Sequence, residues 1–527
     1  MTTHQHFLAT SGETDPVWIH THPFNSIPTF PPLNQHISTE ITIIGSGIAG
    51  VQTAYELVTR GHTVTMLEAR HVLSGETGRT SGHLSTALDD GYIKIKEKHG
   101  LNGAKAAADS HSWAIRRAEQ IVWELGIECE MRSVPGYKLS KYPKGSKEHE
   151  KEMEEIKEEV RTAREAGLDV SFQEGLAVEG WNGRMNQTNG AVFSKQATFH
   201  PTKYISGLLQ WLNQQPTFEC YTDTRVLEIE DTHGHRKIST DRGYTVISSD
   251  VVEATCIPLQ KLSVIAEMGF YRTYCIAVRV PRGSVEDCLL YDTEDPYKYL
   301  RVTACDERDD YLVVGGCDHK VGQEDTHGRF DELEDWVRER FTTAGKVDYR
   351  WSGQIVEPVD CMAFIGKNQG KLHTYVITGD SGNGLTHGIL AGKLISDEIE
   401  EVENPWAGLY NPKRAGSVTK SLGGMLKHDL QINTQYKRWV ESDVKDIEDI
   451  GPGGGGVMHH GTKPVAVYRD EKGEVHKMSA VCPHMKGVVC WNDTEKSWDC
   501  PVHGSRFSCE GMTVEGPAKG GLQAIAT

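Results

Sequence analysis

The stretch Glu40-Ile-Thr-Ile-Ile-Gly-Ser-Gly-Ile-Ala-Gly50 decides the fold of the first four hundred residues. Residues 41–44 predict a short buried strand, and the glycine-rich turn after them leads into helical spacing over residues 48–60. Gly61 ends that helix, and residues 63–67 predict a second strand. The order strand, turn, helix, strand is the start of a βαβ unit in an α/β fold.

The glycines of this turn have the spacing G-x-G-x-x-G, which indicates a dinucleotide site. The first glycine allows the tight turn, the second lets the backbone approach a pyrophosphate, and the third lets helix and strand pack closely. The acid that closes the second strand suits the ribose hydroxyls, and the helix N-terminus attracts the phosphates. The residues assigned here are Gly45, Gly47, Ile48, Ala49, Gly50 and Glu68.

Two further glycine-rich loops, residues 75–84 and 379–388, follow predicted strands. Together with the first turn, they resemble the D-amino-acid-oxidase-like (DAO) family of FAD-dependent oxidoreductases over roughly residues 38–405. The resemblance implies that the second loop wraps the flavin and that the late loop caps its ring. It assigns to FAD the residues Ala69, Arg70, Thr77, Gly78, Arg79, Thr80, Gly82, His83, Leu84, Val226, Ala254, Thr255, Gly366, Asp380, Gly382, Asn383, Gly384, Leu385 and Thr386.

Arg79 stands near the position where some members of that family attach FAD to a histidine, so we expect noncovalent FAD. His83 in the same loop is expected to bind phosphate or backbone. A single dinucleotide fingerprint is present, so we expect no built-in NAD(P)H site. Residues 451–456 are also rich in glycine but lack a preceding apolar strand, and we expect them to form a linker.

The last 75 residues carry the pattern Cys482-Pro-His484, fifteen residues, then Cys500-Pro-Val-His503. This mixed pairing resembles the Rieske [2Fe–2S] domain. The resemblance implies that one iron takes both thiolates and the other both imidazoles, which raises the potential above that of all-cysteine clusters. Zinc is the alternative, but Cys₂His₂ zinc sites favour C-x₂₋₄-C and H-x₃₋₅-H spacing.

Three features are expected to tune the cluster. Gly487 and Val502 stand where high-potential Rieske proteins have a disulfide, so we expect no such clamp. Ser505 can donate a hydrogen bond to a bridging sulfide. Phe507 replaces a tyrosine donor, so we expect a low to intermediate potential. The other ten of the twelve cysteines are expected to be reduced thiols.

The 527 residues therefore predict an N-terminal extended arm (1–38), a DAO-like unit with interleaved FAD-binding and substrate subdomains (39–435), and a Rieske domain (436–527). The fold class is α/β, with a Rossmann-like FAD domain and a mixed-sheet substrate subdomain, plus a small all-β domain. The net charge of −18 argues against nucleic-acid binding. No apolar stretch suits a membrane span or a signal peptide, so we expect a cytoplasmic enzyme.

The joined architecture resembles DAO-like flavoproteins that end in a Rieske domain. It implies hydride transfer from a carbon next to an amine nitrogen, followed by one-electron transfer through the cluster. The expected partners are a small amine or amino-acid-like substrate and an external electron carrier (oxygen, a ferredoxin or a reductase), and a homo-oligomer is allowed. The candidate substrate-side residues are Tyr297, Tyr299, Arg301, His319 and Lys320.

Arg301 suits a carboxylate, and the two tyrosines suit an alkylated or cationic amine. Packing is the alternative role for each of the five. Two other functions stay open: reverse electron flow from a reductase to the flavin, including monooxygenase chemistry, and a non-enzymatic redox carrier or sensor. A Rieske oxygenase is disfavoured because no two histidines are five positions apart.

Overall fold

The computed structural model describes residues 3–142, 144–183, 189–232, 234–259, 263–323, 326–417 and 436–525. The domain boundary expected between residues 435 and 436 adjoins the segment 418–435 and lies outside the described residues. Below, the C-terminal module means residues 436–525 and the main body means residues 37–417.

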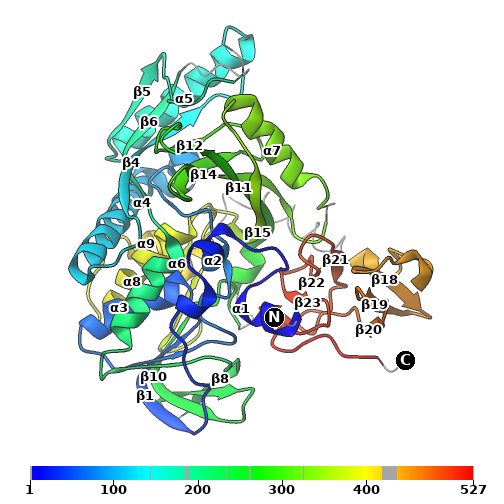
Figure 1. Cartoon of the computed structure of the whole chain (residues 1–527). Coiled ribbons are helices and arrows are strands. Elements are labelled where there is room, and N and C mark those ends of the chain that lie inside the picture. The colour runs from blue at the N-terminus through cyan, green and yellow to red at the C-terminus, as the bar shows by residue number, and fades with distance from the viewer. Residues whose placement is uncertain are drawn as a thin grey trace.

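The first sheet of the main body is built on the expected βαβ unit (Figure 1). β1 (Ile37–Ile44) pairs in parallel with β2 (Val64–Leu67) and β10 (Thr245–Glu253), and α3 (Ile48–Thr59) joins the first two. The other strands of this sheet are β7 (Phe218–Tyr221), β8 (Val226–Thr232), β9 (His235–Thr240), β16 (Phe364–Lys367) and β17 (Thr374–Thr378). The last four residues of β1 are buried, as expected of a parallel strand covered by helices.

Helices pack beside this sheet and bring the late glycine-rich loop to the first one. α8 (Gly384–Ile399) follows that late loop and packs on α3. The others are α4 (Gly91–Leu125), α6 (Pro201–Leu212) and α9 (Ala407–Tyr410). The helix expected over residues 101–127 begins ten residues earlier, because α4 continues across a kink at Gly100, whose φ of 72° is non-helical.

The second sheet is mixed, as residues 170–360 predict. Its strands are β3 (His83–Leu84), β4 (Arg132–Leu139), β5 (Val170–Glu174), β6 (Asn189–Thr198), β11 (Met268–Pro281), β12 (Leu289–Tyr291), β13 (Tyr299–Ala304), β14 (Asp309–Lys320) and β15 (Val347–Pro358). α5 (Lys147–Glu165) and α7 (Arg329–Arg340) pack on it. The predicted fold class is confirmed.

The C-terminal module consists of two small antiparallel sheets and lies beside β15 (Figure 1). One contains β18 (Gly454–His460), β19 (Lys463–Arg469) and β20 (Val475–Ser479). The other contains β21 (Cys490–Asn492), β22 (Ser497–Asp499), β23 (Arg506–Ser508) and β24 (Thr513–Glu515).

The prediction of a linker over residues 451–456 is wrong for its second half, because Gly454, Gly455 and Gly456 are the first residues of β18. A Cβ on Gly455 would lie 2.6 Å from the Trp491 ring, so the glycine allows an indole to pack on the strand.

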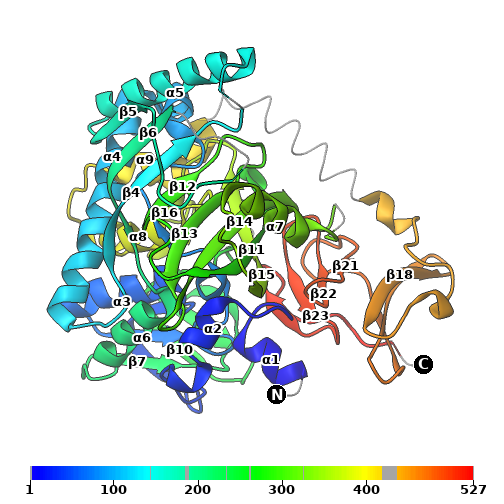
Figure 2. The ribbon, with the colours of Figure 1, turned by 45° about the horizontal axis from the view of Figure 1, so that its top comes forward.

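The N-terminal arm is not extended throughout (Figure 2). It forms α1 (Thr3–Ala9) and α2 (Val17–Thr21), because its apolar side chains are core residues. Phe7 is fully buried in the hydrophobic core of the C-terminal module, and Trp18 is fully buried in the main body. The arm therefore joins the two parts of the chain.

Candidate functional site

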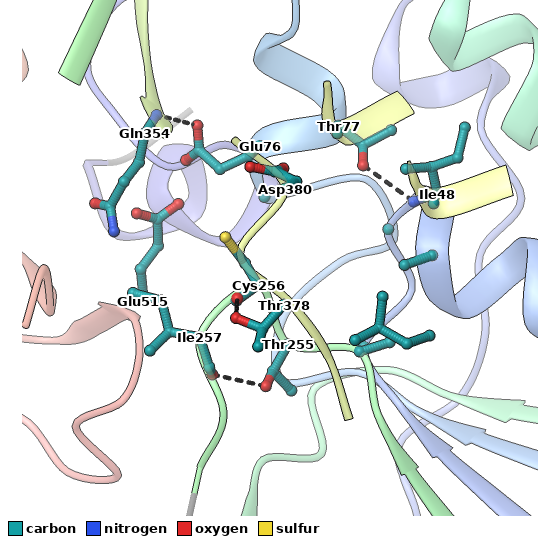
Figure 3. Close-up of a pocket in the computed structure, with 18 of the residues that line it drawn as sticks. Ile48, Glu76, Thr77, Thr255, Cys256, Ile257, Gln354, Thr378, Asp380 and Glu515 are labelled. Atoms are coloured by element: carbon teal, nitrogen blue, oxygen red, sulfur yellow. Dashed lines mark hydrogen bonds between the residues drawn. The ribbon is translucent and has the colours of Figure 1, made fainter. Parts of the chain in front are cut away.

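A deep pocket lies where the three glycine-rich loops meet (Figure 3). We call it the FAD pocket. The predicted residues that line it are Gly45, Gly47, Ile48, Ala49, Glu68, Ala69, Arg70, Thr77, Arg79, Thr80, Val226, Ala254, Thr255, Asp380, Gly382, Gly384 and Leu385. The lining does not include the predicted residues Gly50, Gly78, Gly82, His83, Leu84, Gly366, Asn383 and Thr386.

The floor of the pocket requires glycine. Gly45 has a φ of +105°, and a Cβ there would lie 2.4 Å from the carbonyl oxygen of Ala254. A Cβ on Gly50 would lie 2.0 Å from the carbonyl oxygen of Gly45, so Gly50 acts behind the lining by letting α3 approach β1. Glu68 accepts hydrogen bonds from Ser46 N at 2.9 Å and Ser46 Oγ at 2.8 Å. A bare backbone turn, a helix N-terminus and a fixed acid fit a dinucleotide.

The second glycine-rich loop is tied to the first. Ile48 N, at the start of α3, donates to Thr77 Oγ1 at 3.0 Å. Arg79 lines the pocket, but its fully buried guanidinium contacts Ser352 O at 2.6 Å and Glu495 Oε1 at 2.7 Å. This loop therefore contacts both the pocket and the C-terminal module.

Several pocket residues were missed by the sequence analysis: Glu76, Thr273, Cys275, Gln354, His387 and Glu515. Glu76 and His387 belong to the second and late glycine-rich loops, which were predicted as loops without these two members. The other four lie on strands and approach the loops only in three dimensions, which no local spacing reveals.

The four predicted cluster ligands come together on two adjacent loops. The Cys482 and Cys500 side chains are buried and hydrogen-bonded to each other, which lowers the pKa of the Cys482 thiol. The rings of His484 and His503 have centroids 5.1 Å apart. Two thiols and two imidazoles on facing loops are the donor set of a Rieske [2Fe–2S] cluster, so the residues fit that group.

Gly487 and Ser505, two of the predicted tuning positions, lie beside the two cysteines. A Cβ on Gly487 would lie 2.4 Å from Val502 Cγ2, so the two loops touch at the place of the missing disulfide clamp, and all twelve cysteines are free. Ser505 Oγ accepts from Ala518 N at 3.1 Å and also hydrogen-bonds the Cys482 thiol. Phe507 is fully buried.

One side chain lies between the FAD pocket and the cluster loops. Gln354, on β15, lines the pocket. A Cβ on Gly504 would lie 2.6 Å from Gln354 Nε2 and 3.1 Å from Phe270 Cδ1. The His503 ring centroid lies 6.0 Å from that of Phe270. The predicted cluster ligand His503 and the FAD pocket are therefore separated only by side chains of β11 and β15.

The five substrate-side candidates are placed differently. Tyr299 lines the pocket, and its hydroxyl lies 3.1 Å from Thr273 Oγ1. The Tyr297 ring lies 5.5 Å from that of Tyr299. His319 Nε2 lies 2.9 Å from the Tyr274 hydroxyl, and Lys320 lies over the Tyr271 ring, and neither His319 nor Lys320 is in the pocket lining.

Arg301 is fully buried behind the second loop. Its guanidinium donates to the carbonyl oxygens of Gly82, Phe199 and Val302 and lies over the Trp18 ring. This placement favours holding the Gly82 turn over binding a substrate carboxylate.

Three half-buried carboxyl groups, which are not in the pocket lining, lie near one another and close to the lining residues Gly382 and Thr273. We call Asp89, Asp318 and Glu357 the acidic recess. Burial first, and for Asp89 and Glu357 also repulsion between neighbouring acids, raises the pKa of Asp89 to about 7, that of Asp318 to about 6 and that of Glu357 to about 8. Asp89 lies against Gly382 and hydrogen-bonds Tyr297, while Asp318 hydrogen-bonds Thr273.

Comparison with known families decides the identity of the main body. The model of the DAO family, described as FAD-dependent oxidoreductase, matches residues 40–398. The chain belongs to the DAO family of FAD-dependent oxidoreductases. A Rieske [2Fe–2S] model matches residues 440–526. The recognition of both parts is confirmed, and with it FAD and a [2Fe–2S] cluster as the cofactors that these families imply.

Relatives of this DAO-family chain match it over different lengths. A Bacillus subtilis protein described as a Rieske 2Fe–2S iron–sulfur protein, YhfW, is 28% identical over 526 residues, which are 99% of each chain. Escherichia coli gamma-glutamylputrescine oxidoreductase is 23% identical over 71% of this chain and 86% of its own. The Bacillus subtilis protein is similar over nearly the whole chain. The Escherichia coli protein is similar over 71% of it.

Solved structures share the fold. L-proline dehydrogenase from P. horikoshii superposes with a TM-score of 0.60 at 15% identity, over 73% of this chain and 99% of its own. Glycine oxidase from Geobacillus kaustophilus superposes with a TM-score of 0.59 at 17% identity, over 70% and 96%. Within the described residues, no helix has the length and hydropathy to cross a bilayer.

Proposed function

We propose that the chain oxidises a C–N bond of a small amine or amino-acid-like substrate and passes the electrons singly through its own Rieske cluster to an external acceptor. FAD would supply the hydride acceptor and the cluster a one-electron carrier. The observation that supports this most is the position of Gln354, which lines the FAD pocket and lies against Gly504, next to the ligand His503.

The chain's own residues then have distinct tasks. The predicted residues of the three glycine-rich loops would hold FAD, and Tyr299 and Thr273 would form the wall beside the substrate. Arg301 would position the Gly82 turn from behind. The paired aromatic rings of Tyr297 and Tyr299 could pack on an alkylated amine.

The acidic recess favours a cationic amine within this substrate class. Asp318, with a pKa of about 6, is mostly ionised at neutral pH, and its charge attracts an ammonium group and repels a carboxylate group. An acid whose pKa lies near 7 also matches the requirement for a base that takes a proton at neutral pH. Asp89, hydrogen-bonded to Tyr297, is our candidate for that base.

Anaerobic stopped-flow mixing tests this function. An amine substrate should bleach the flavin band first and the cluster band second. Gln354→Ala should slow the second phase at least tenfold and leave the first unchanged, whereas Gln173→Ala, an exposed glutamine on β5, should change neither. Bleaching of the flavin by a reduced ferredoxin, with none by any amine, would favour the reverse direction and contradict the proposal.

A further inference from the structure

The C-terminal module forms part of the wall of the FAD pocket. Val514, Glu515 and Gly516, at the end of β24, line it together with residues of the main body. Arg225 holds this end in place by donating to Thr513 O at 2.8 Å. The Rieske part of the chain thus contributes side chains to a flavin site.

Glu515 faces a second carboxyl group, that of Glu76 in the second glycine-rich loop (Figure 3). Both residues line the pocket, and each acts on the pKa of the other. Two carboxylates that face each other in a largely buried wall repel, which favours one proton on the pair. Glu76 accepts from Ser11 Oγ at 3.1 Å and from Gln354 N, so Glu76 is stabilised as the anion. The proton therefore belongs on Glu515, where burial and the Glu76 charge raise the pKa.

The surrounding cations are already engaged with other groups. Arg506 makes two 2.7 Å hydrogen bonds to Asp499, and Arg79 contacts Glu495. Arg272 donates to Ser352 Oγ and Gln354 Oε1. Arg70 is a further cation near both acids, and it donates to the carbonyl oxygens of Phe7, Thr10 and Ser74. Asp380 and Cys256 also face the pair. A proton, rather than a dedicated cation, thus offsets the second carboxyl charge.

We propose that FAD binding by this chain is coupled to protonation of the Glu76–Glu515 pair, so that the Rieske module supplies a proton-holding side chain to the FAD site. Glu76 precedes Thr77, whose hydroxyl accepts from Ile48 N at the helix N-terminus suited to a diphosphate. A second ionised carboxylate in this wall would repel the FAD diphosphate. The proton comes from solvent and binds the Glu515 carboxylate, and no other bond changes.

The test measures FAD binding to the full chain from which FAD has been removed. Flavin fluorescence monitors the binding at several pH values between 6 and 9. For one linked proton, the Kd of the wild type should rise with pH by up to about tenfold per unit. Glu515→Gln keeps the size and polarity of the side chain without the charge, so its Kd should stay low and vary little. Glu510→Gln, an exposed acid of the same module, removes the same charge and should behave as wild type.

Asp380 is the competing explanation, because burial first and then the Glu76 charge raise its pKa to about 7. An unchanged slope in Glu515→Gln, or a slope removed only by Asp380→Asn, would overturn the proposal. If the Glu515→Gln variant does not take up the cluster, the Glu76→Gln variant is used instead, because it also leaves a single carboxyl group in the pair. An unchanged dependence of Kd on pH in Glu76→Gln would likewise overturn the proposal. The test needs neither a substrate nor electron transfer, so it is independent of the proposed function.

Discussion

Arg79 and Glu495 form an ion pair in which neither side chain is exposed to solvent, with Arg79 Nη2 2.7 Å from Glu495 Oε1. Arg79 comes from the second glycine-rich loop and Glu495 from the turn between β21 and β22. Thr14 of the arm also donates to Glu495 and accepts from Arg79. The pair therefore joins the main body, the C-terminal module and the N-terminal arm at one point.

Removing one partner of this pair should strongly destabilise the chain. Glu495→Ala leaves the Arg79 charge buried without its partner, and we expect a loss of about 3–5 kcal/mol in the free energy of unfolding. Denaturant unfolding followed by cluster absorbance measures it. Arg338→Ala, which breaks a more exposed pair with Glu334 on α7, should cost less than about 1 kcal/mol. Equal losses in the two variants would contradict the central role of the junction.

The same pair gives a pH dependence with a definite sign. Burial would raise the pKa of Glu495, but the charges of Arg79, Arg506 and Arg272 lower it to about 2 from the ordinary 4.5. A lowered carboxyl pKa stabilises the folded chain above the ordinary value, and this contribution is lost as the pH falls from about 4.5 towards 2. Unfolding measured at pH 5, 4 and 3 should show this loss, with a shallower slope in Glu495→Gln. Parallel slopes would assign the acid sensitivity to other groups.

Ser505 should raise the potential of the cluster. Its hydroxyl hydrogen-bonds the Cys482 thiol, and such a bond stabilises the more negative, reduced state of a cluster ligand. Ser505→Ala should therefore lower the midpoint potential, measured by redox titration of the cluster circular dichroism. Ser442→Ala, at an exposed hydroxyl outside the ligand loops, is the control and should leave the potential unchanged. A potential that is also unchanged in Ser505→Ala would mean that the hydroxyl does not act on the cluster.

The acidic recess should determine how tightly a cationic substrate binds. Asp318→Asn removes one carboxylate beside Thr273 while keeping its size, so KM for a cationic amine should rise about tenfold, the effect of about 1.4 kcal/mol. KM for a neutral amine should change little. Steady-state kinetics with a matched pair of such amines makes the comparison, and equal changes for both would argue against charge recognition.

The sequence predicted the parts whose chemistry is local in the chain. The turn at Gly45 and the pairs Cys482/His484 and Cys500/His503 are short motifs because a tight turn or a ligand loop needs neighbouring residues. Gln354, Glu495 and Glu515 could not be found in this way. They act across contacts between segments more than a hundred residues apart, and nothing in their own strands and turns predicts those partners. Arg301, predicted to bind a substrate carboxylate, also shows what local patterns miss. Only the fold shows that its guanidinium donates to backbone carbonyl oxygens instead.

The position of Phe7 has a practical consequence for how this chain can be divided. Its side chain fills the core of the C-terminal module, so the first ten residues and the last ninety complete one another. A fragment cut out at residue 436 would carry all four predicted cluster ligands yet lack a piece of its own interior. A truncation that removes Phe7 would therefore act on an iron–sulfur domain that lies far along the chain from it.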